Sequence, residues 1–269
     1  MTSAGGDEAA LIQAVLRAAG VDEPTAVEVV GHGLSGDLVF RVGGVRRLFG
    51  KIADPRRRTS AAELGREIGM LRWLDGAAGA ARLAWTGEAA GVMSMLTEAI
   101  EGVALHALDP AEAERGALAG LEALARLHAL PIETCPFDER LAVKLAAARR
   151  HLERGEVDLD RLEPHNLGRP IADVWRDLLA RRPADEDLVV THGDASWPNF
   201  ILRPDSAAGM VDLGRGGVAD RCQDLALFIR SAKRNFPLLP IDELVARGYP
   251  LGAPDAARLT FYRELDEFF

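Results

Sequence analysis

The residue types best suited to chemistry in this chain lie near position 194. The segment Thr191-His192-Gly193-Asp194 is followed by Asn199, at an interval of five residues from Asp194, and by Asp212 after an apolar run. In phosphoryl transfer from ATP, one carboxylate accepts the proton of the attacking hydroxyl, while an Asn and a second Asp hold Mg²⁺ against the phosphates. The spacing therefore predicts Asp194 as the base and Asn199 and Asp212 as the metal ligands. Each residue taken alone has an ordinary alternative role in a turn.

A glycine-containing segment at residues 31–36 matches the pattern G-x-G-x-x-G and runs into an apolar, β-branched stretch at residues 38–42. A dinucleotide-binding loop would open a helix, whereas the loop that covers nucleotide phosphates in a kinase runs into a strand. The segment therefore predicts a phosphate-covering loop, with Ser35 and Gly36 against the nucleotide. A plain turn is the alternative.

Lys51 is one of only three lysines among the 32 basic residues, and it lies in the apolar stretch 48–52. Its ammonium is suited to neutralise the α and β phosphates of ATP, and Glu67 follows 16 residues later on an amphipathic pattern, where it would orient the lysine through an ion pair. The alternative is a solvated lysine and an unrelated glutamate. Because the other basic residues are almost all arginine, we favour the functional interpretation.

These residues must be positioned by an α+β architecture. The apolar periodicity predicts helices at residues 8–20, 61–74, 109–128, 141–153 and 171–181, and strands at 38–42, 45–52, 91–96, 188–190, 200–202 and 209–211. Strands dominate the first part of the chain and helices the second. We therefore expect a nucleotide-binding lobe over residues 1–98 and a catalytic and substrate-binding lobe over 99–269.

The composition excludes several classes of protein. The chain has 269 residues with a formal charge of −9, and 48% of its residues are hydrophobic, which indicates a globular protein with a sizeable core. An acidic balance argues against nucleic acid and favours a cationic partner. No apolar stretch of about 18 uncharged residues predicts a membrane span. The two cysteines make no disulfide framework, and residues 1–7 lack the basic start of a signal peptide. We therefore expect a cytoplasmic protein.

Four segments together resemble the aminoglycoside phosphotransferase family: residues 191–199, the run 211–221 with Gln223-Asp224-Leu225-Ala226, the segment 135–138, and the ending 261–269. The resemblance implies a two-lobed, protein-kinase-like fold that uses MgATP to phosphorylate a hydroxyl of an aminocyclitol antibiotic. His192-Gly193-Asp194 replaces the His-Arg-Asp of protein kinases, and no Ala-Pro-Glu segment follows Asp212. A small-molecule acceptor is therefore favoured over a protein.

The resemblance also implies roles for individual residues. Arg215 is placed near the substrate or phosphate, Asp224 braces the catalytic loop from a helix, and His192 orients that loop. Glu98 and Ile100 lie in the connector whose backbone binds adenine. We expect a monomer or a weak dimer.

The acceptor site is expected to be acidic, because carboxylates bind the ammonium groups of aminoglycosides. By resemblance, Asp158, Asp160 and Glu163 before the catalytic segment, together with Glu267 and the carboxylate of Phe269, would form it. A solvated acidic loop and a frayed terminus are the alternatives. Where many 3′-enzymes have acidic or polar residues, this chain has Arg161, Pro164, Ser231 and Arg234. The ending 261–269 resembles 3′-phosphotransferases in particular, so 3′ is favoured over 3″. Other segments look closer to streptomycin 3″-phosphotransferases, which leaves the regiochemistry open.

Two alternatives to an aminoglycoside kinase stay open. One is a kinase of another small hydroxylated metabolite, such as an amino alcohol or a sugar. The other is a nucleotide-binding pseudoenzyme that acts as a regulator. The second is disfavoured because a pseudoenzyme usually lacks one of the catalytic residues, and here all of them are present: Lys51, Glu67, Asp194, Asn199 and Asp212.

Overall fold

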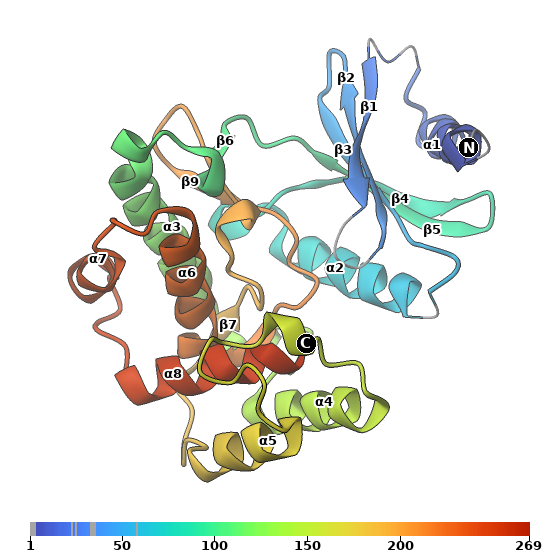
Figure 1. Cartoon of the computed structure of the whole chain (residues 1–269). Coiled ribbons are helices and arrows are strands. Elements are labelled where there is room, and N and C mark those ends of the chain that lie inside the picture. Colours follow the sequence, from blue (N-terminus) through green and yellow to red (C-terminus); the bar gives the residue numbers. More distant parts are fainter. Residues whose placement is uncertain (1–3, 23, 25, 33–35, 58) are drawn as a thin grey trace. The chain divides into compact units, whose positions relative to one another are not determined.

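The computed structural model describes residues 4–22, 24, 26–32, 36–57 and 59–269, and the chain divides into two compact units (Figure 1). The first comprises residues 1–101 and 210–215, and the second comprises 102–209 and 216–269. The division falls after Glu101, where the sequence suggested a boundary after Glu98. Residues 210–215 return to the first unit, where Ala81 N–H donates to the carbonyl of Met210 at 2.9 Å.

The first unit contains a five-stranded antiparallel sheet with the order β1-β2-β3-β5-β4. Its strands are β1 (Ala26–His32), β2 (Leu38–Gly43), β3 (Leu48–Ile52), β4 (Leu83–Ala89) and β5 (Val92–Glu98). The predictions of β2, β3 and β5 are confirmed, whereas β1 and β4 were missed. Gly31 interrupts the apolar pattern of β1 and Gly87 that of β4, which removes the alternation that marks a strand.

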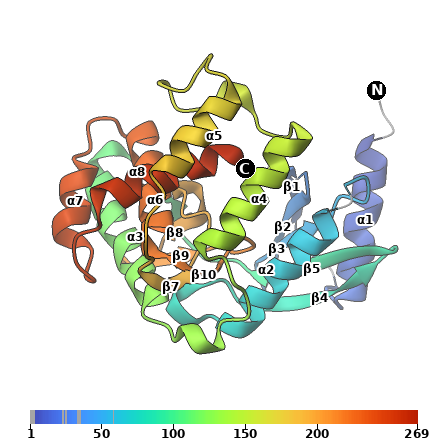
Figure 2. The ribbon, with the colours of Figure 1, turned by 90° about the horizontal axis from the view of Figure 1, so that it is seen from below.

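Two helices complete this unit. Helix α1 (Ala4–Ala18) buries Ile12, Val15 and Leu16 in one core with Phe40 and Leu96 of the sheet. Helix α2 (Ser60–Leu74) packs against β4 and β5, followed by a short 3₁₀ turn at Ala77–Gly79. Figure 2 shows both helices beside the sheet strands. The helices predicted at 8–20 and 61–74 are therefore confirmed within a few residues at their ends.

The second unit is mainly helical. Its α-helices are α3 (Ala113–His128), α4 (Leu141–Arg154), α5 (Ile171–Ala180), α6 (Arg221–Asn235), α7 (Ile241–Gly248) and α8 (Ala256–Leu265). Helices α4, α5, α6 and α8 share a core in which Phe261 and Phe268 are fully buried. The helices predicted at 141–153 and 171–181 are confirmed, and the one predicted at 109–128 begins with the 3₁₀ turn Pro110–Glu112 before α3.

Short strands and 3₁₀ turns connect these helices. Strand β7 (Leu188–Thr191) pairs antiparallel with β10 (Gly217–Asp220), and β6 (Val103–Ala104), β8 (Phe200–Leu202) and β9 (Ala208–Met210) form a three-stranded sheet. The remaining 3₁₀ turns are Leu105–Ala107, Ile132–Thr134, Leu159–Arg161, Trp197–Asn199 and Asp266–Phe268. Across the described part of the chain, no helix has both the length and the apolar character needed to cross a membrane.

Candidate active site

Lys51 lies at the centre of the charged groups in the first unit. Its Nζ donates to Oε2 of Glu67 at 2.6 Å and to Oδ1 of Asp212 at 2.9 Å. Side chains alternate along a strand, and Leu48 and Ile52 of β3 face the core beneath α1. Lys51 therefore points to the opposite face of the sheet, where α2 carries Glu67.

The backbone beside Lys51 depends on a glycine. Gly50 pairs with Phe40 of the neighbouring strand, and the Phe40 ring covers it. A Cβ at position 50 would lie 2.0 to 2.6 Å from three atoms of that ring. Only glycine allows the fully buried ring to cross β3 at this point, so this contact fixes the strand next to Lys51.

Burial and neighbouring charges shift the pKa values of Lys51 and Glu67. Burial acts to lower the pKa of the Lys51 ammonium, but the charges of Glu67 and Asp212 outweigh it, so this pKa lies above its ordinary value. Burial raises the pKa of the Glu67 carboxyl to about 7, against the opposing charge of Lys51. Lys51 is therefore a permanent cation at neutral pH, held by a buried carboxyl that titrates near neutrality.

Asp212 comes from a segment distant in the sequence. It has a φ of 60°, in the left-handed region that Asp adopts more readily than most residues. The segment is tied to α2, because Nε of Arg66 donates to the carbonyl of Gly214 at 3.3 Å. The Asp212 side chain is 50% exposed, so its carboxylate contacts Lys51 and is also accessible to a ligand.

In the second unit, Asp224 of α6 anchors the loop that carries Asp194. The buried Asp224 carboxylate accepts backbone hydrogen bonds from His192 at 2.7 Å and from Gly193 at 2.9 Å. Gly193 has a φ of 83°, which glycine adopts without strain. Burial acts to raise the pKa of Asp224, but the hydrogen bonds that it accepts from the His128 ring and the His192 backbone outweigh it, so the pKa lies below its ordinary value. Asp224 therefore stays ionised and holds the loop.

The side chains of Asp194 and Asn199 remain able to bind a ligand. Asp194 is held through its backbone, since its N–H donates to Nδ1 of His192 at 3.3 Å and its carbonyl accepts from Nδ2 of Asn199 at 3.0 Å. Its partly exposed carboxylate forms no hydrogen bond or ion pair with any residue that the structure describes. Nδ2 of Asn199 also donates to Oγ of Ser196 at 3.2 Å, which leaves its Oδ1 as the atom available to a cation.

The expected nucleotide contacts are only partly described. Ser35, with Gly33 and Leu34 of the glycine segment, lies outside the described residues. Gly36 has a φ of 78°, and a Cβ there would meet Cδ of Arg57 at 3.2 Å. Glu98 forms an ion pair with Arg46 at 3.1 Å. The backbone N–H of Ile100 donates to no described residue, which suits it to bind adenine.

The expected acceptor residues separate into a buried and an exposed set. Glu267 is 7% exposed, and both of its carboxylate oxygens accept from Nδ2 of Asn166, at 3.3 and 3.2 Å. The Asn166 amide is oriented by Arg169, whose Nη1 donates to Oδ1 of Asn166 at 2.9 Å. Because an arginine only donates, this contact fixes Nδ2 toward Glu267.

Burial raises the pKa of Glu267, and the Asn166 amide opposes that rise. Among the described residues no cation forms an ion pair with Glu267, and Arg181 is bound by both oxygens of Glu264. Glu163 is also partly buried and lies 3.7 Å from Nε of Arg263. A buried carboxylate without a countercharge is a ready binding group for a cation.

The other expected acceptor residues are more exposed. Asp158 and Asp160 are exposed in the 3₁₀ turn, where Oδ1 of Asp158 accepts from the Asp160 N–H at 3.1 Å. Phe269 is 39% exposed, and the centroid of its ring lies 5.4 Å from Nζ of Lys144. Arg215, which was expected near the substrate or phosphate rather than in the acidic acceptor set, is partly buried. These observations assign no ligand to any of the four.

The two units divide the candidate residues between them. The first unit holds Lys51, Glu67, Glu98, Ile100, Asp212 and Arg215, and the second holds Asp194, Asn199, Asp158, Asp160, Glu163, Glu267 and Phe269. No group of three or more His, Cys, Asp or Glu side chains in the described residues is placed to hold a metal ion on its own. Asp212 in the first unit offers a carboxylate oxygen and Asn199 in the second an amide oxygen, and each is a ligand type that Mg²⁺ accepts.

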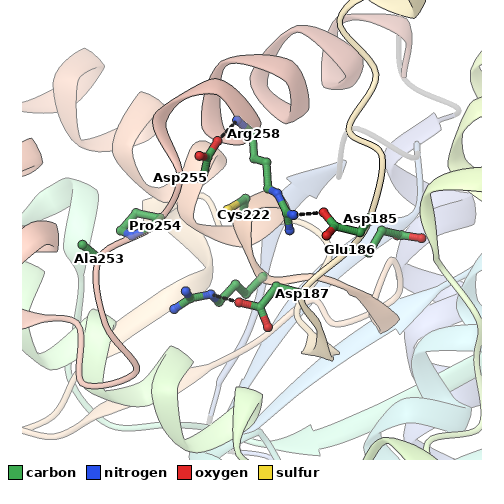
Figure 3. A pocket seen from close by; sticks show the side chains of 9 residues that line it. Asp185, Glu186, Asp187, Cys222, Ala253, Pro254, Asp255 and Arg258 are labelled. Carbon is green, nitrogen blue, oxygen red and sulfur yellow. Dashed lines mark hydrogen bonds and ion pairs between the residues drawn. The ribbon is translucent and has the colours of Figure 1, made fainter.

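A hollow of about 520 Å³ in the second unit does not include these residues (Figure 3). It is lined by the segment 185–187 before β7, the start of α6, and residues 253–258 at the start of α8. Its charged groups pair with one another, since Arg258 contacts Asp185 and Asp220 and Arg221 contacts Asp187 at 2.7 Å. The hollow lies at the opposite end of β7 from the catalytic loop.

Sequence reasoning missed several residues that support the site. Asn166 orients Glu267, and His128 contacts Asp224 from α3. Ser231 accepts the backbone N–H of Trp197 at 2.9 Å and so holds the loop between Asp194 and Asn199. Each contact joins positions far apart in the sequence, so the only local signal is a polar residue in an otherwise apolar segment.

Comparison with known proteins bears on the fold and the family. The phosphotransferase enzyme family matches residues 26–262. An aminoglycoside 3′-phosphotransferase of Streptomyces fradiae is 35% identical over 252 residues, which cover 89% of this chain and 94% of that protein. The crystal structure of an aminoglycoside-3′-phosphotransferase of type VIII superposes with a TM-score of 0.79 at 33% identity, covering 96% and 99% of the two chains.

A third similar protein is the aminoglycoside phosphotransferase APH(3″)-Id from Streptomyces rimosus, solved in complex with ADP and streptomycin. It superposes with a TM-score of 0.80 at 27% identity, covering 97% of this chain and 98% of that chain. The α+β, two-lobed, protein-kinase-like fold expected from the sequence is confirmed by these neighbours and by the two units.

Proposed function

The chain belongs to the aminoglycoside phosphotransferase family, and from this premise we propose that it is an ATP- and Mg²⁺-dependent O-phosphotransferase that phosphorylates a hydroxyl of an aminoglycoside antibiotic. Asp194 is the base in this proposal, and phosphorylation of the antibiotic confers resistance. The 3′ hydroxyl is favoured over the 3″ hydroxyl, because most of the similar curated enzymes are 3′-phosphotransferases.

The observation that carries the proposal is the state of Asp194. Its carboxylate is accessible and has no partner among the described residues, while its backbone is held on both sides by His192 and Asn199. A general base needs this combination, because it must meet the proton of an acceptor hydroxyl in a fixed position. In an aspartate with only a structural role in a turn, the carboxylate would accept a hydrogen bond from a nearby backbone N–H.

The first unit supplies the groups for the donor nucleotide. Lys51 remains charged at neutral pH and is oriented by Glu67, so it is suited to bind the α and β phosphates. Asp212 of this unit and Asn199 of the second unit are each proposed as ligands of Mg²⁺, which would neutralise charge on the phosphates. The Ile100 N–H is suited to donate to adenine, and Arg215 is proposed to lie near the phosphate or the acceptor.

The second unit supplies the groups for the acceptor. Glu267 is a buried carboxylate without an ion-pair partner among the described residues, and Glu163 lies in the segment that also carries Asn166. An ammonium group of an aminoglycoside would provide the countercharge that Glu267 lacks. Asp158, Asp160 and Phe269 are proposed as further contacts. The related enzyme solved with streptomycin supports an acceptor of this class.

The test is phosphate transfer from ATP and GTP to a panel of acceptors. The panel contains a kanamycin-type antibiotic, streptomycin and non-antibiotic alcohols such as choline, with Asp194→Asn as the inactive control and NMR to locate the phosphate. Transfer to the kanamycin-type 3′ hydroxyl is expected. Transfer to streptomycin alone would refute the 3′ assignment, and transfer only to non-antibiotic alcohols would refute the substrate class. The absence of transfer to every acceptor would refute the enzyme assignment.

A further inference from the structure

We propose that Tyr249 is a positioning residue for the catalytic loop, and that it acts through His128 and Asp224. Tyr249 follows the last residue of α7. The effect on turnover rests on the proposed role of Asp194. The hydrogen bonds that link Tyr249 to the loop do not depend on that role.

A continuous set of buried hydrogen bonds joins Tyr249 to the loop. The Tyr249 hydroxyl lies 2.6 Å from Nδ1 of His128, and Nε2 of His128 lies 3.0 Å from Oδ2 of Asp224. The same Asp224 oxygen accepts the N–H of His192, and its other oxygen accepts the N–H of Gly193. The residue after Gly193 is Asp194. Side chains of α3, α6 and the end of α7 are thus connected to the backbone of the loop that carries the base.

The proton on each bond is determined by the groups at the two ends. Asp224 is ionised and only accepts, so Nε2 of His128 must carry a proton. In the neutral imidazole Nδ1 is then an acceptor, and the Tyr249 hydroxyl donates to it. Burial raises the pKa of Tyr249 above its ordinary value, so the phenol keeps its proton. Tyr249 therefore selects the tautomer in which His128 donates to Asp224.

Removal of the hydroxyl alone would upset this arrangement. Without a donor at Nδ1, His128 is free to adopt the other tautomer, in which the proton lies on Nδ1 and a bare Nε2 faces Asp224. The carboxylate then loses one of its three donors, and the loop backbone is held less rigidly. A buried acceptor that loses its partner weakens its site by an amount that corresponds to about tenfold in a rate or equilibrium constant.

The alternative is that Tyr249 only packs. Its ring meets the His128 ring edge-on with centroids 5.9 Å apart, and the guanidinium of Arg221 lies 5.6 Å from its centroid. Phenylalanine would keep both ring contacts and would remove only the hydroxyl, which hydrogen-bonds His128 and also Arg221. Tyr249→Phe therefore separates the hydroxyl from the packing.

The chain contains a matched control. It has only two tyrosines, and the other, Tyr262, is buried to a similar extent, with 2% of its surface exposed against 3% for Tyr249. The Tyr262 hydroxyl has no hydrogen-bond partner among the described residues. Tyr262→Phe therefore removes an equally buried hydroxyl that is not connected to the loop.

The experiment combines kinetics of both variants with long-range ¹H–¹⁵N NMR of the histidine side chains. We expect Tyr249→Phe to lower kcat about tenfold with the KM for ATP unchanged, Tyr262→Phe to lower neither, and His128 in the wild type to carry its proton on Nε2. A wild-type His128 with its proton on Nδ1 overturns the proposal, and that measurement needs no variant. Equal kinetic effects of the two substitutions, or none, also overturn it. If the wild type transferred no phosphate, the proposed function would fail while the NMR result still decided the role of Tyr249.

Discussion

Replacing Glu67 with Gln should change the stability and the activity of the protein in opposite directions. Burial raises the pKa of the Glu67 carboxyl from 4.5 to about 7. A group whose pKa is raised by folding stabilises the fold fully below its unfolded pKa, and loses that contribution as the pH rises through the folded value. The difference, 7 − 4.5, is about 2.5 pKa units, and at about 1.4 kcal/mol for each unit it corresponds to roughly 3 kcal/mol.

Gln has nearly the same shape as Glu and no charge at any pH. The free energy of unfolding of Glu67→Gln, measured relative to the wild type, should therefore rise by roughly 3 kcal/mol as the pH increases from about 5 to 8. Lys51 does not titrate in this window, because its pKa lies above its ordinary value. Activity should change in the opposite direction, since Lys51 loses the buried partner that orients it, and kcat/KM for ATP should fall about 10- to 100-fold.

The measurements are urea denaturation followed by circular dichroism across this pH range, and a coupled assay of ATP turnover. Glu63→Gln is the control, because Glu63 lies on the same helix but is exposed and pairs only loosely with Arg57, at 3.5 Å. A stability difference that is constant with pH, or that falls as the pH rises, would refute the argument about burial. An unchanged kcat/KM for ATP would refute the orienting role.

Four further substitutions test the rest of the site. Asp194→Asn should lower kcat by about 10² to 10⁴ with little change in the KM for ATP, and a variant that keeps more than half of wild-type turnover would exclude Asp194 as the base. Asp212→Ala should raise the Mg²⁺ concentration needed for half-maximal activity, and an unchanged Mg²⁺ titration would contradict its role as a ligand. Gly50→Ala should destabilise the protein by about 1 to 3 kcal/mol, because the new Cβ collides with the Phe40 ring. Gly65→Ala is the control, because its Cβ would meet nothing closer than 3.8 Å. Thermal denaturation of both variants measures the difference, and equal stabilities would contradict the collision. Asn166→Ala should raise the KM for a cationic antibiotic about tenfold with the KM for ATP unchanged, and equal changes in both KM values would count against its role in orienting Glu267.

The sequence predicted best those site residues whose roles follow from short intervals or from the periodicity of a single strand or helix. The interval from Asp194 to Asn199 lies within one loop, and Lys51 lies on a strand whose apolar alternation is visible in the sequence, as does Glu67 on its amphipathic helix. The alternation of β3 determines which face Lys51 occupies, and the helix period places Glu67 toward it. Among the strands that were missed, β1 and β4 carry glycines that break this alternation. They form because the neighbouring strands supply hydrogen-bond partners, which periodicity alone does not reveal.

The residues that hold the reacting groups in place could not be predicted from the sequence, for a different reason. His128 and Tyr249 are 121 residues apart, and Asn166 and Glu267 are 101 apart, so neither pair leaves a local pattern. His128 looked like an ordinary polar residue at the end of an apolar helix, and its importance comes from the anion that faces it. A polar side chain can be buried only where partners satisfy its donors and acceptors, so a buried His or Asn implies a network that only the fold identifies. In this chain the groups expected to react can therefore be read from spacing, whereas the groups that hold them in place are set by contacts between distant helices.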